Sequence, residues 1–319
     1  MKTALIMGIS GQDGALLAEH LLKQGYKVSG TSRDHEVGNF WRLEALGIRD
    51  RVTLTSAVLS DFRSVLGALQ QTMPDEVYNL AGQTSVGMSF LYPVETFDSI
   101  LIGTMNILEC LRFLGKKIRF YNAGSSECFG NTREPANEET PFRPRSPYAT
   151  AKAAAHYAVS NYREAYGIFG CTGILFNHES PLRPARFVTQ KIVSAASRIA
   201  AGSQERLCLG NLKVCRDWGW APEYVRAMWL MLQGDKPVDL VVASGEEHSL
   251  EEFVARVFGA FDLNWRDHVV VDESLFRPSD IEHSCGNASR ALAELGWRPE
   301  TLFSGVVEKL VAAARNKSA

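Results

Sequence analysis

The 319-residue sequence lacks every feature that would place it outside the ordinary globular proteins. No apolar run reaches the length of about 18 residues that a membrane-spanning helix needs, so we expect no membrane partner. The apolar stretch behind Met1 ends at Gly8 without a cleavage site, so no signal peptide is expected. The 34 basic and 36 acidic residues leave a formal net charge of −2, which offers no basic field to nucleic acid.

Cysteine is scattered rather than clustered. The six cysteines include no CxxC pair and show no spacing typical of metal ligands. Disulfide frameworks belong to oxidising compartments. We therefore expect reduced thiols, no bound metal and a cytoplasmic protein.

Short apolar runs alternate with amphipathic segments through the first half of the sequence, which is typical of a parallel sheet with helices on both faces. Six strands are predicted, over residues 4–7, 27–30, 52–55, 76–79, 118–122 and 172–175. Apolar residues recur at helical spacing over 16–23, 100–114 and 222–232. The predicted fold class is α/β, with a Rossmann-like doubly wound sheet over 1–175 that a segment near 218–235 rejoins. Residues 176–319, where Gly and Pro interrupt the pattern, form mainly a smaller α/β lobe for the substrate.

The run GISGQDG over residues 8–14 stands between a predicted strand and a predicted helix, as a dinucleotide-binding turn requires. Small residues let the backbone approach a pyrophosphate, and the helix N-terminus offers unpaired N–H groups to it. The candidate cofactor-binding residues here are Gly8, Ser10, Gly11, Gln12, Asp13 and Gly14. The spacing is GxxGxxG rather than GxGxxG, so a merely tight strand-to-helix turn is the alternative.

The end of the second predicted strand bears on the choice of cofactor. An acidic residue there binds the ribose of NAD, whereas basic and hydroxyl residues suit the additional phosphate of NADP. Ser32 and Arg33 favour NADP, with Arg33 as the phosphate ligand. Asp34 follows directly and keeps NAD open as the alternative, and a solvated Arg33 without a ligand is the other.

Two further motifs carry chemistry. Tyr148 and Lys152 are four residues apart on a helix that Pro147 would start, so they share one face, where an ammonium would favour the phenolate. Ser125 and Glu127 follow the predicted strand over 118–122, at the edge where open α/β sheets bind ligands. A dehydrogenase needs only a hydroxyl there, so the carboxylate indicates a second acid or base. An exposed helical pair and a capping Glu are the ordinary alternatives.

Together these residues resemble the extended short-chain dehydrogenase/reductases, and beyond Phe176 the resemblance narrows to the GDP-mannose 4,6-dehydratase family. It extends over nearly the whole chain. Its most specific blocks are GISGQDG at 8–14, YNLA at 78–81, FNHESP at 176–181, RDWG at 216–219 and LGW at 295–297.

The resemblance implies a redox-neutral dehydration of a GDP-sugar to its 4-keto-6-deoxy product, with hydride moved from C4 to C6 and the cofactor regenerated. Tyr148 would take the C4 hydroxyl proton and Ser125 would hydrogen-bond the C4 oxygen. Glu127 would remove the C5 proton and assist loss of the C6 hydroxyl. Lys152 would hold the cofactor ribose and tune Tyr148.

The resemblance also implies binding residues and an assembly. Leu80 and Ala81 would contact the cofactor, together with Tyr148 and Lys152. The implied substrate-binding residues are Ser85, Asn177, Lys191, Arg216, Arg277 and Asp280. Of these, Arg216 and Arg277 would bind the diphosphate, for which surface ion pairing is the alternative. His178 is expected to tie a loop together rather than to react. The assembly would be a homodimer or homotetramer.

The sequence departs from the family's pattern at several ligand-contacting positions, namely Asp34, Val58, Pro184 and Gln190. These departures suggest a sugar other than mannose, such as GDP-manno-heptose, and put the tetramer contacts in doubt. A nucleotide-sugar 4-epimerase or 4-reductase would share the fold and the Tyr-Lys pair but needs no C5 base. A non-catalytic nucleotide-binding regulator is the alternative from another class.

Overall fold

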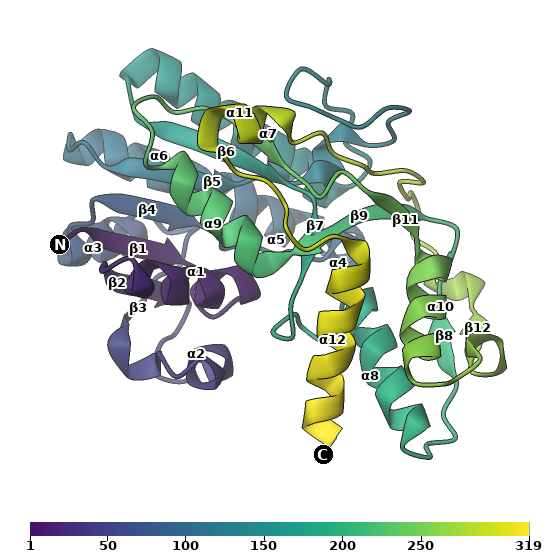
Figure 1. Cartoon of the computed structure of the whole chain (residues 1–319). Coiled ribbons are helices and arrows are strands. Elements are labelled where there is room, and N and C mark those ends of the chain that lie inside the picture. Colours follow the sequence, from purple (N-terminus) through teal and green to yellow (C-terminus); the bar gives the residue numbers. More distant parts are fainter. Residues whose placement is uncertain (319) are drawn as a thin grey trace.

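The computed structural model describes residues 1–318 and contains one large parallel sheet (Figure 1). Its seven strands lie in the order β10-β6-β5-β4-β1-β2-β3. Their bounds are β1 Thr3–Met7, β2 Lys27–Ser32, β3 Thr53–Ser56, β4 Glu76–Asn79, β5 Arg119–Ala123, β6 Gly170–Leu175 and β10 Leu240–Val242. The six predicted strands and the α/β fold class are confirmed, whereas the short β10 was not predicted.

Alternation along the strands supplies two hydrophobic cores, because successive side chains point to opposite faces of a sheet. In β1, Ala4 and Ile6 face one core, and Leu5 and Met7 face the other. The first core is closed by α1 (Gln12–Lys23) and α9 (Ala221–Met231). The second is closed by α3 (Phe62–Thr72), α6 (Gly103–Leu114) and α7 (Pro147–Tyr166). Buried on both faces, the sheet leaves only its strand ends for ligands.

Segments from the last third of the chain return to the first core. The predicted helix over 222–232 occurs as α9, which packs on α1, and β10 pairs with β6 at the sheet edge. Beyond them, α11 (Ser289–Leu295) packs on α9, and the buried Trp297 indole donates a hydrogen bond to the Glu223 carbonyl at 2.9 Å.

The second lobe is built around a core of its own. It holds a three-stranded sheet of β7 (Asn177–Glu179), β9 (Cys215–Trp220) and β11 (Glu247–Ser249) and a two-stranded sheet of β8 (Leu207–Leu209) and β12 (Val269–Val271). The helices α8 (Val188–Ala200), α10 (Leu250–Ala260) and α12 (Phe303–Ser318) pack together there, with Trp218 and Phe303 among the buried rings. Figure 1 shows this lobe beside the carboxyl end of the large sheet.

The connections between strands contain three further short helices: α2 (Trp41–Ala45), α4 (Val86–Leu91) and α5 (Pro93–Phe97). Within residues 1–318, none of the helices combines the length and the apolar character that crossing a membrane requires.

Candidate active site

The glycine run forms the predicted turn between β1 and α1. Gly8 has a φ of +85°, and a Cβ there would lie 2.9 Å from the Ala81 Cα, so this turn passes closely over the residues that follow β4. Gly11 is the N-cap of α1 and gives the helix no side-chain cap. The first N–H groups of a helix have no partner within the helix. The turn therefore has two features that suit a pyrophosphate. Its glycines have no side chain that would keep a ligand away from the backbone, and the N-terminus of α1 has no side-chain cap.

The three glycines differ in how tightly they are packed. A Cβ on Gly14 would lie 2.4 Å from the Gly8 carbonyl oxygen and 2.7 Å from the Ile9 Cα, both backbone atoms that cannot move aside. On Gly11, the nearest atom would be the Gly8 oxygen at 3.4 Å, an ordinary contact.

We therefore expect Gly14→Ala to lower the free energy of unfolding of the cofactor-free protein by about 1–3 kcal/mol, the usual cost of overpacking. Gly11→Ala is the matched control and should stay within about 0.5 kcal/mol of the wild type. Urea unfolding followed by circular dichroism measures both variants. Equal effects of the two substitutions would show that backbone crowding at Gly14 does not limit the turn.

Arg33 and Asp34 follow β2 on the protein surface. The Asp34 carboxylate accepts hydrogen bonds from the backbone N–H groups of Glu36 at 2.9 Å and Val37 at 3.4 Å. Asp34 is thus occupied in holding its own loop. Arg33 has no hydrogen bond or ion pair within the described residues, so its guanidinium is available to an anionic group.

The predicted catalytic residues meet beyond the carboxyl end of β5. Ser125 is buried and caps a short 3₁₀ helix (Ser126–Phe129), accepting a hydrogen bond from the Glu127 N–H at 3.3 Å. Tyr148 and Lys152 are buried on the first turns of α7, which begins at Pro147 as predicted. The Lys152 Nζ donates to the Ala123 carbonyl at 2.7 Å, and the Ser125 hydroxyl is close enough to influence the Tyr148 phenol. Two hydroxyls, an amine and a carboxylate therefore share one end of the sheet.

The expected lowering of the Tyr148 pKa by Lys152 is not what the structure shows. Burial raises the pKa of the Tyr148 phenol above its ordinary value, and the hydrogen bond with Ser125 acts in the opposite direction. Burial also lowers the pKa of Lys152 to about 8. The Lys152 Nζ lies 5.9 Å from the centre of the Tyr148 ring, and its hydrogen bond goes to a backbone carbonyl. Burial, not the neighbouring ammonium, thus dominates the Tyr148 environment.

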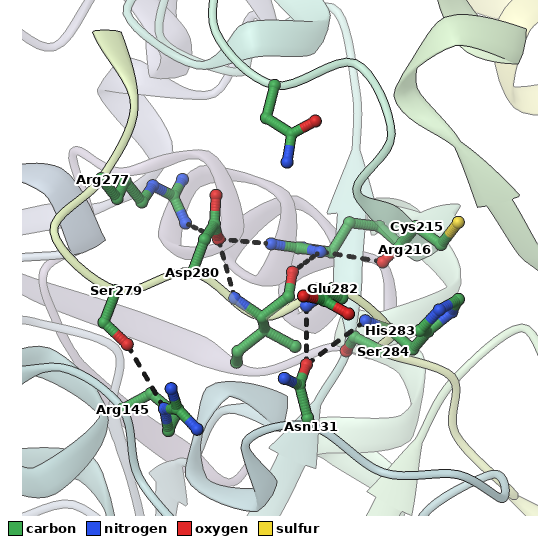
Figure 2. Close-up of polar contacts among 12 residues, drawn as sticks. Asn131, Arg145, Cys215, Arg216, Arg277, Ser279, Asp280, Glu282, His283 and Ser284 are labelled. Carbon is green, nitrogen blue, oxygen red and sulfur yellow. Dashed lines mark hydrogen bonds and ion pairs between the residues drawn. The ribbon is translucent and has the colours of Figure 1, made fainter. Parts of the chain in front are cut away.

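Figure 2 shows a cluster of charged residues from β9 and the segment after β12. The buried Arg216 contacts Asp280 at 3.0 Å, and Arg277 contacts the same Asp280 oxygen at 3.3 Å. Arg216 also donates to the Ile281 carbonyl at 2.7 Å, which holds the guanidinium in place. Burial raises the pKa of Glu127, while the charges of Arg216 and Arg277 lower it and that of Asp280 raises it. The arginine pair and the carboxylate of Glu127 therefore interact electrostatically.

The other predicted substrate residues are more dispersed. Asn177 begins β7 and is partly buried, two residues after the end of β6 and on the strand that pairs with β9. The Ser85 hydroxyl is the N-cap of α4 and accepts from the Met88 N–H at 3.3 Å. Lys191, exposed on α8, donates to the Cys208 carbonyl on β8 at 2.7 Å. Leu80 continues from β4 with its N–H bonded to the Met7 carbonyl, and Ala81 lies against Gly8.

One residue near the turn, Arg42, did not stand out in the sequence. It donates to the Ser10 carbonyl at 3.0 Å and to the Leu182 carbonyl at 2.7 Å, and so joins the glycine turn to the segment after β7. No motif marked it. His178 bonds to Asp13, and the predicted loop-tying role of His178 agrees with that contact. Asp13 belongs to the motif at 8–14 and His178 to the motif at 176–181, but nothing in the sequence showed that these two motifs are in contact.

Known proteins resemble the chain over almost its full length. The sequence profile of the GDP-mannose 4,6 dehydratase family matches residues 5–310. GDP-mannose 4,6 dehydratase 1 of Arabidopsis thaliana is 47% identical over 320 residues, covering 97% of this chain and 89% of the relative. The human GDP-mannose 4,6 dehydratase is 40% identical over 338 residues, covering 98% and 91%.

Solved structures agree on the fold. The UDP-glucose 4-epimerase of Thermus thermophilus, in complex with NAD, has a TM-score of 0.87 at 26% identity, covering 98% of this chain and 99% of that one. RMD from Pseudomonas aeruginosa, complexed with NADPH, has a TM-score of 0.83 at 24% identity, covering 99% and 100%. Relatives of this fold thus hold either nicotinamide dinucleotide.

A Rossmann-like sheet whose carboxyl edge carries Ser125, Tyr148 and Lys152 defines the extended short-chain dehydrogenase/reductase class. Within that class, the extent of the family match and the identities above are decisive. The chain belongs to the GDP-mannose 4,6-dehydratase family.

Proposed function

We propose that the protein catalyses the 4,6-dehydration of GDP-mannose to GDP-4-keto-6-deoxymannose, as a hydro-lyase. The observation that carries the proposal is the place of Glu127: a carboxylate at the same sheet edge as Ser125 and Tyr148, facing a pair of arginines. An enzyme that only moves hydride at C4 has no use for that carboxylate. Membership of the dehydratase family supports the same conclusion.

The roles of the buried groups follow from their chemistry. When bound, a nicotinamide cofactor would accept a hydride and later return it. Once deprotonated, Tyr148 takes the proton of the C4 hydroxyl, and Ser125, whose hydroxyl influences the Tyr148 phenol, holds the C4 oxygen. A keto group at C4 acidifies the C5 hydrogen, which Glu127 removes before giving a proton to the departing C6 hydroxyl. Lys152, fixed by the Ala123 carbonyl, holds the cofactor ribose.

Arg216 and Arg277 bind the diphosphate, because planar guanidinium groups bind phosphate oxygens through paired, charge-assisted hydrogen bonds. Both arginines are held by Asp280, which keeps them together before the substrate arrives. Asn177, Ser85 and Lys191 are proposed as further substrate contacts. Asp280 is proposed to bind a ribose hydroxyl or the base, in addition to its contacts with the arginines.

The cofactor is proposed to be NADP. Arg33 is exposed and has no hydrogen bond or ion pair within residues 1–318, and the Asp34 carboxylate is turned to its own loop, which removes the main objection to a 2′-phosphate there. Extracting the dinucleotide that copurifies tests this proposal. Recovery of NAD alone would overturn it.

A homodimer or homotetramer is proposed for the assembly. Phe113 on α6 and Tyr157 and Tyr166 on α7 are large apolar side chains with exposed fractions of 69%, 59% and 53%. The two helices pack side by side, so these exposed side chains lie on neighbouring elements and would be covered by a partner subunit placed there. The two-lobe division also stays a proposal, supported by the separate core around Trp218 and by the return of α9 to the first core.

The test of the function is incubation of the purified enzyme and NADP⁺ with GDP-mannose and, separately, with GDP-manno-heptose, followed by mass spectrometry. Loss of one water from GDP-mannose is expected. A substrate converted without loss of water would indicate an epimerase or reductase, and preference for the heptose would move the assignment to that sugar.

Arg277 gives a prediction about substrate binding. Arg277→Ala should raise the KM for GDP-mannose by about tenfold, the cost of one charge-assisted hydrogen bond, with little change in kcat. The guanidinium binds ground state and transition state alike. Arg133, an exposed arginine outside the cluster, is the matched control, and Arg133→Ala should leave KM unchanged. An effect on kcat alone would exclude the diphosphate role.

Glu127 gives a prediction about pH. Because burial raises its pKa, the base is lost when the pH falls through a value above the ordinary 4.5. A bound diphosphate would neutralise the two arginines that oppose this shift. The acid limb of kcat should therefore have its midpoint above 4.5. A pH profile recorded where circular dichroism shows the fold intact measures it, and a midpoint at or below 4.5 would contradict the role of Glu127.

A further inference from the structure

Hydrogen bonds interlock the glycine turn with the strand β7, although the paired residues are 165 and more positions apart. The His178 Nε2 lies 2.9 Å from an Asp13 carboxylate oxygen. The Gln12 amide donates to the other Asp13 oxygen at 2.9 Å and to the His178 carbonyl at 3.3 Å. The Ser180 hydroxyl donates to the Gln12 Oε1 at 2.8 Å. Gln12, His178 and Ser180 are buried, so water does not compete for these bonds.

The bond between Asp13 and His178 joins a carboxylate to a buried imidazole ring. The His178 Nδ1 lies 2.7 Å from the Phe176 carbonyl oxygen, which can only accept a hydrogen bond. Although burial alone would raise it, the charge and hydrogen bond of His178 lower the pKa of Asp13 to about 2, so this carboxylate is ionised and also only accepts. Both ring nitrogens of His178 therefore lie within hydrogen-bond distance of an oxygen atom, which fixes the orientation of the ring. Its ring stacks on Tyr224 with centroids 4.6 Å apart.

This pair controls the backbone on both sides of Asn177. The His178 ring holds the Phe176 carbonyl, while Gln12 and Arg183 hold the His178 carbonyl, at 3.3 and 3.2 Å. The position of Asn177 therefore depends on residues of the glycine turn.

We propose that Asp13 and His178 are positioning residues that make binding of the dinucleotide and of the GDP-sugar cooperative. The proposal rests on the proposed function, which places the dinucleotide on residues 8–14 and the substrate at Asn177. A ligand on either segment favours the bonded arrangement of both. The second ligand then meets a segment that is already ordered, and linkage requires the effect to be equal in both directions.

Two substitutions at His178 separate its two hydrogen bonds. In His178→Gln the amide nitrogen reaches the place of Nε2, so the bond to Asp13 is kept and the bond to Phe176 is lost. In His178→Asn the amide nitrogen takes the place of Nδ1, so the reverse holds. Isothermal titration gives the Kd of GDP with and without saturating NADP⁺, and the ratio of the two values measures the coupling.

For the wild type we expect NADP⁺ to tighten GDP binding by about tenfold, within the usual range of such couplings. His178→Gln should keep most of this ratio, and His178→Asn should bring it close to one. Asp13→Asn should also bring it close to one and serves if His178→Asn fails to fold. A general loss of stability lowers the melting temperature without removing the ratio.

A wild-type ratio of one, or an undiminished ratio in both His178→Asn and Asp13→Asn, would overturn the proposal. Failure of the proposed function is a separate result. Cooperative binding without dehydration of GDP-mannose would leave the coupling and remove the activity, whereas dehydration with independent binding would do the opposite.

Discussion

Glu127→Gln is expected to stop the loss of water while leaving oxidation at C4 in place. The amide has nearly the size of the carboxylate, so the fold and the partly buried site are preserved, but it can neither remove the C5 proton nor donate one to the C6 oxygen. Loss of a positioned acid or base costs roughly 10²–10⁴-fold in rate. Here one residue serves both purposes, so we expect the upper part of that range for product formation.

The variant should stall after the first step, with reduced nicotinamide accumulating in proportion to enzyme. Single-turnover absorbance of the reduced cofactor and mass spectrometry of the sugar report the two events separately. Glu134, exposed in the loop after the site, provides the control substitution Glu134→Gln. Full product formation by Glu127→Gln would remove Glu127 from the mechanism and with it the main argument for a dehydratase.

Tyr148→Phe is expected to block the reaction one step earlier. Without the phenol oxygen nothing takes the C4 hydroxyl proton, because Ser125 is a far weaker base and Lys152 is engaged with the Ala123 carbonyl. We expect a fall in kcat of about 10³-fold or more, with no reduced nicotinamide formed. Because burial raises the Tyr148 pKa, the phenol must lose its own proton before it can act as this base. The positive charge of a bound oxidised nicotinamide would favour that loss.

The same single-turnover assay distinguishes the two variants, because only Glu127→Gln should accumulate reduced cofactor. Tyr157→Phe is the matched control on α7, since the Tyr157 side chain is 59% exposed. Reduced cofactor in Tyr148→Phe at the rate of the wild type would transfer the role of base to another group.

Local patterns were sufficient for most of the fold. Short apolar runs predicted six strands of the large sheet, and Pro147 predicted the start of α7. The glycine run marked the turn before α1 because the crowding at Gly14 excludes any side chain. β10 was not predicted because a strand of three residues is too short to show a recognisable hydrophobic pattern.

Contacts between distant segments were beyond the sequence. Asp280 could be paired with Arg216 or with a ligand, and only the packing of its segment against β9 shows that it bonds to both arginines. The sign of the Tyr148 pKa shift was expected wrongly, because the four-residue spacing to Lys152 predicts a shared helix face but not the burial that outweighs it.

The sequence alone determined the glycine turn and the order of the strands along the chain, and it singled out Ser125, Glu127, Tyr148 and Lys152 as candidates, because each of these patterns depends on neighbours within a few positions. The tertiary structure decided what meets what: that Glu127 faces Arg216 and Arg277, and that Asp13 of the turn bonds to His178 of β7. The physical reason is that the burial and the electrostatic environment of a site depend on side chains from several segments. Folding brings those segments together, so neither quantity can be obtained from local sequence.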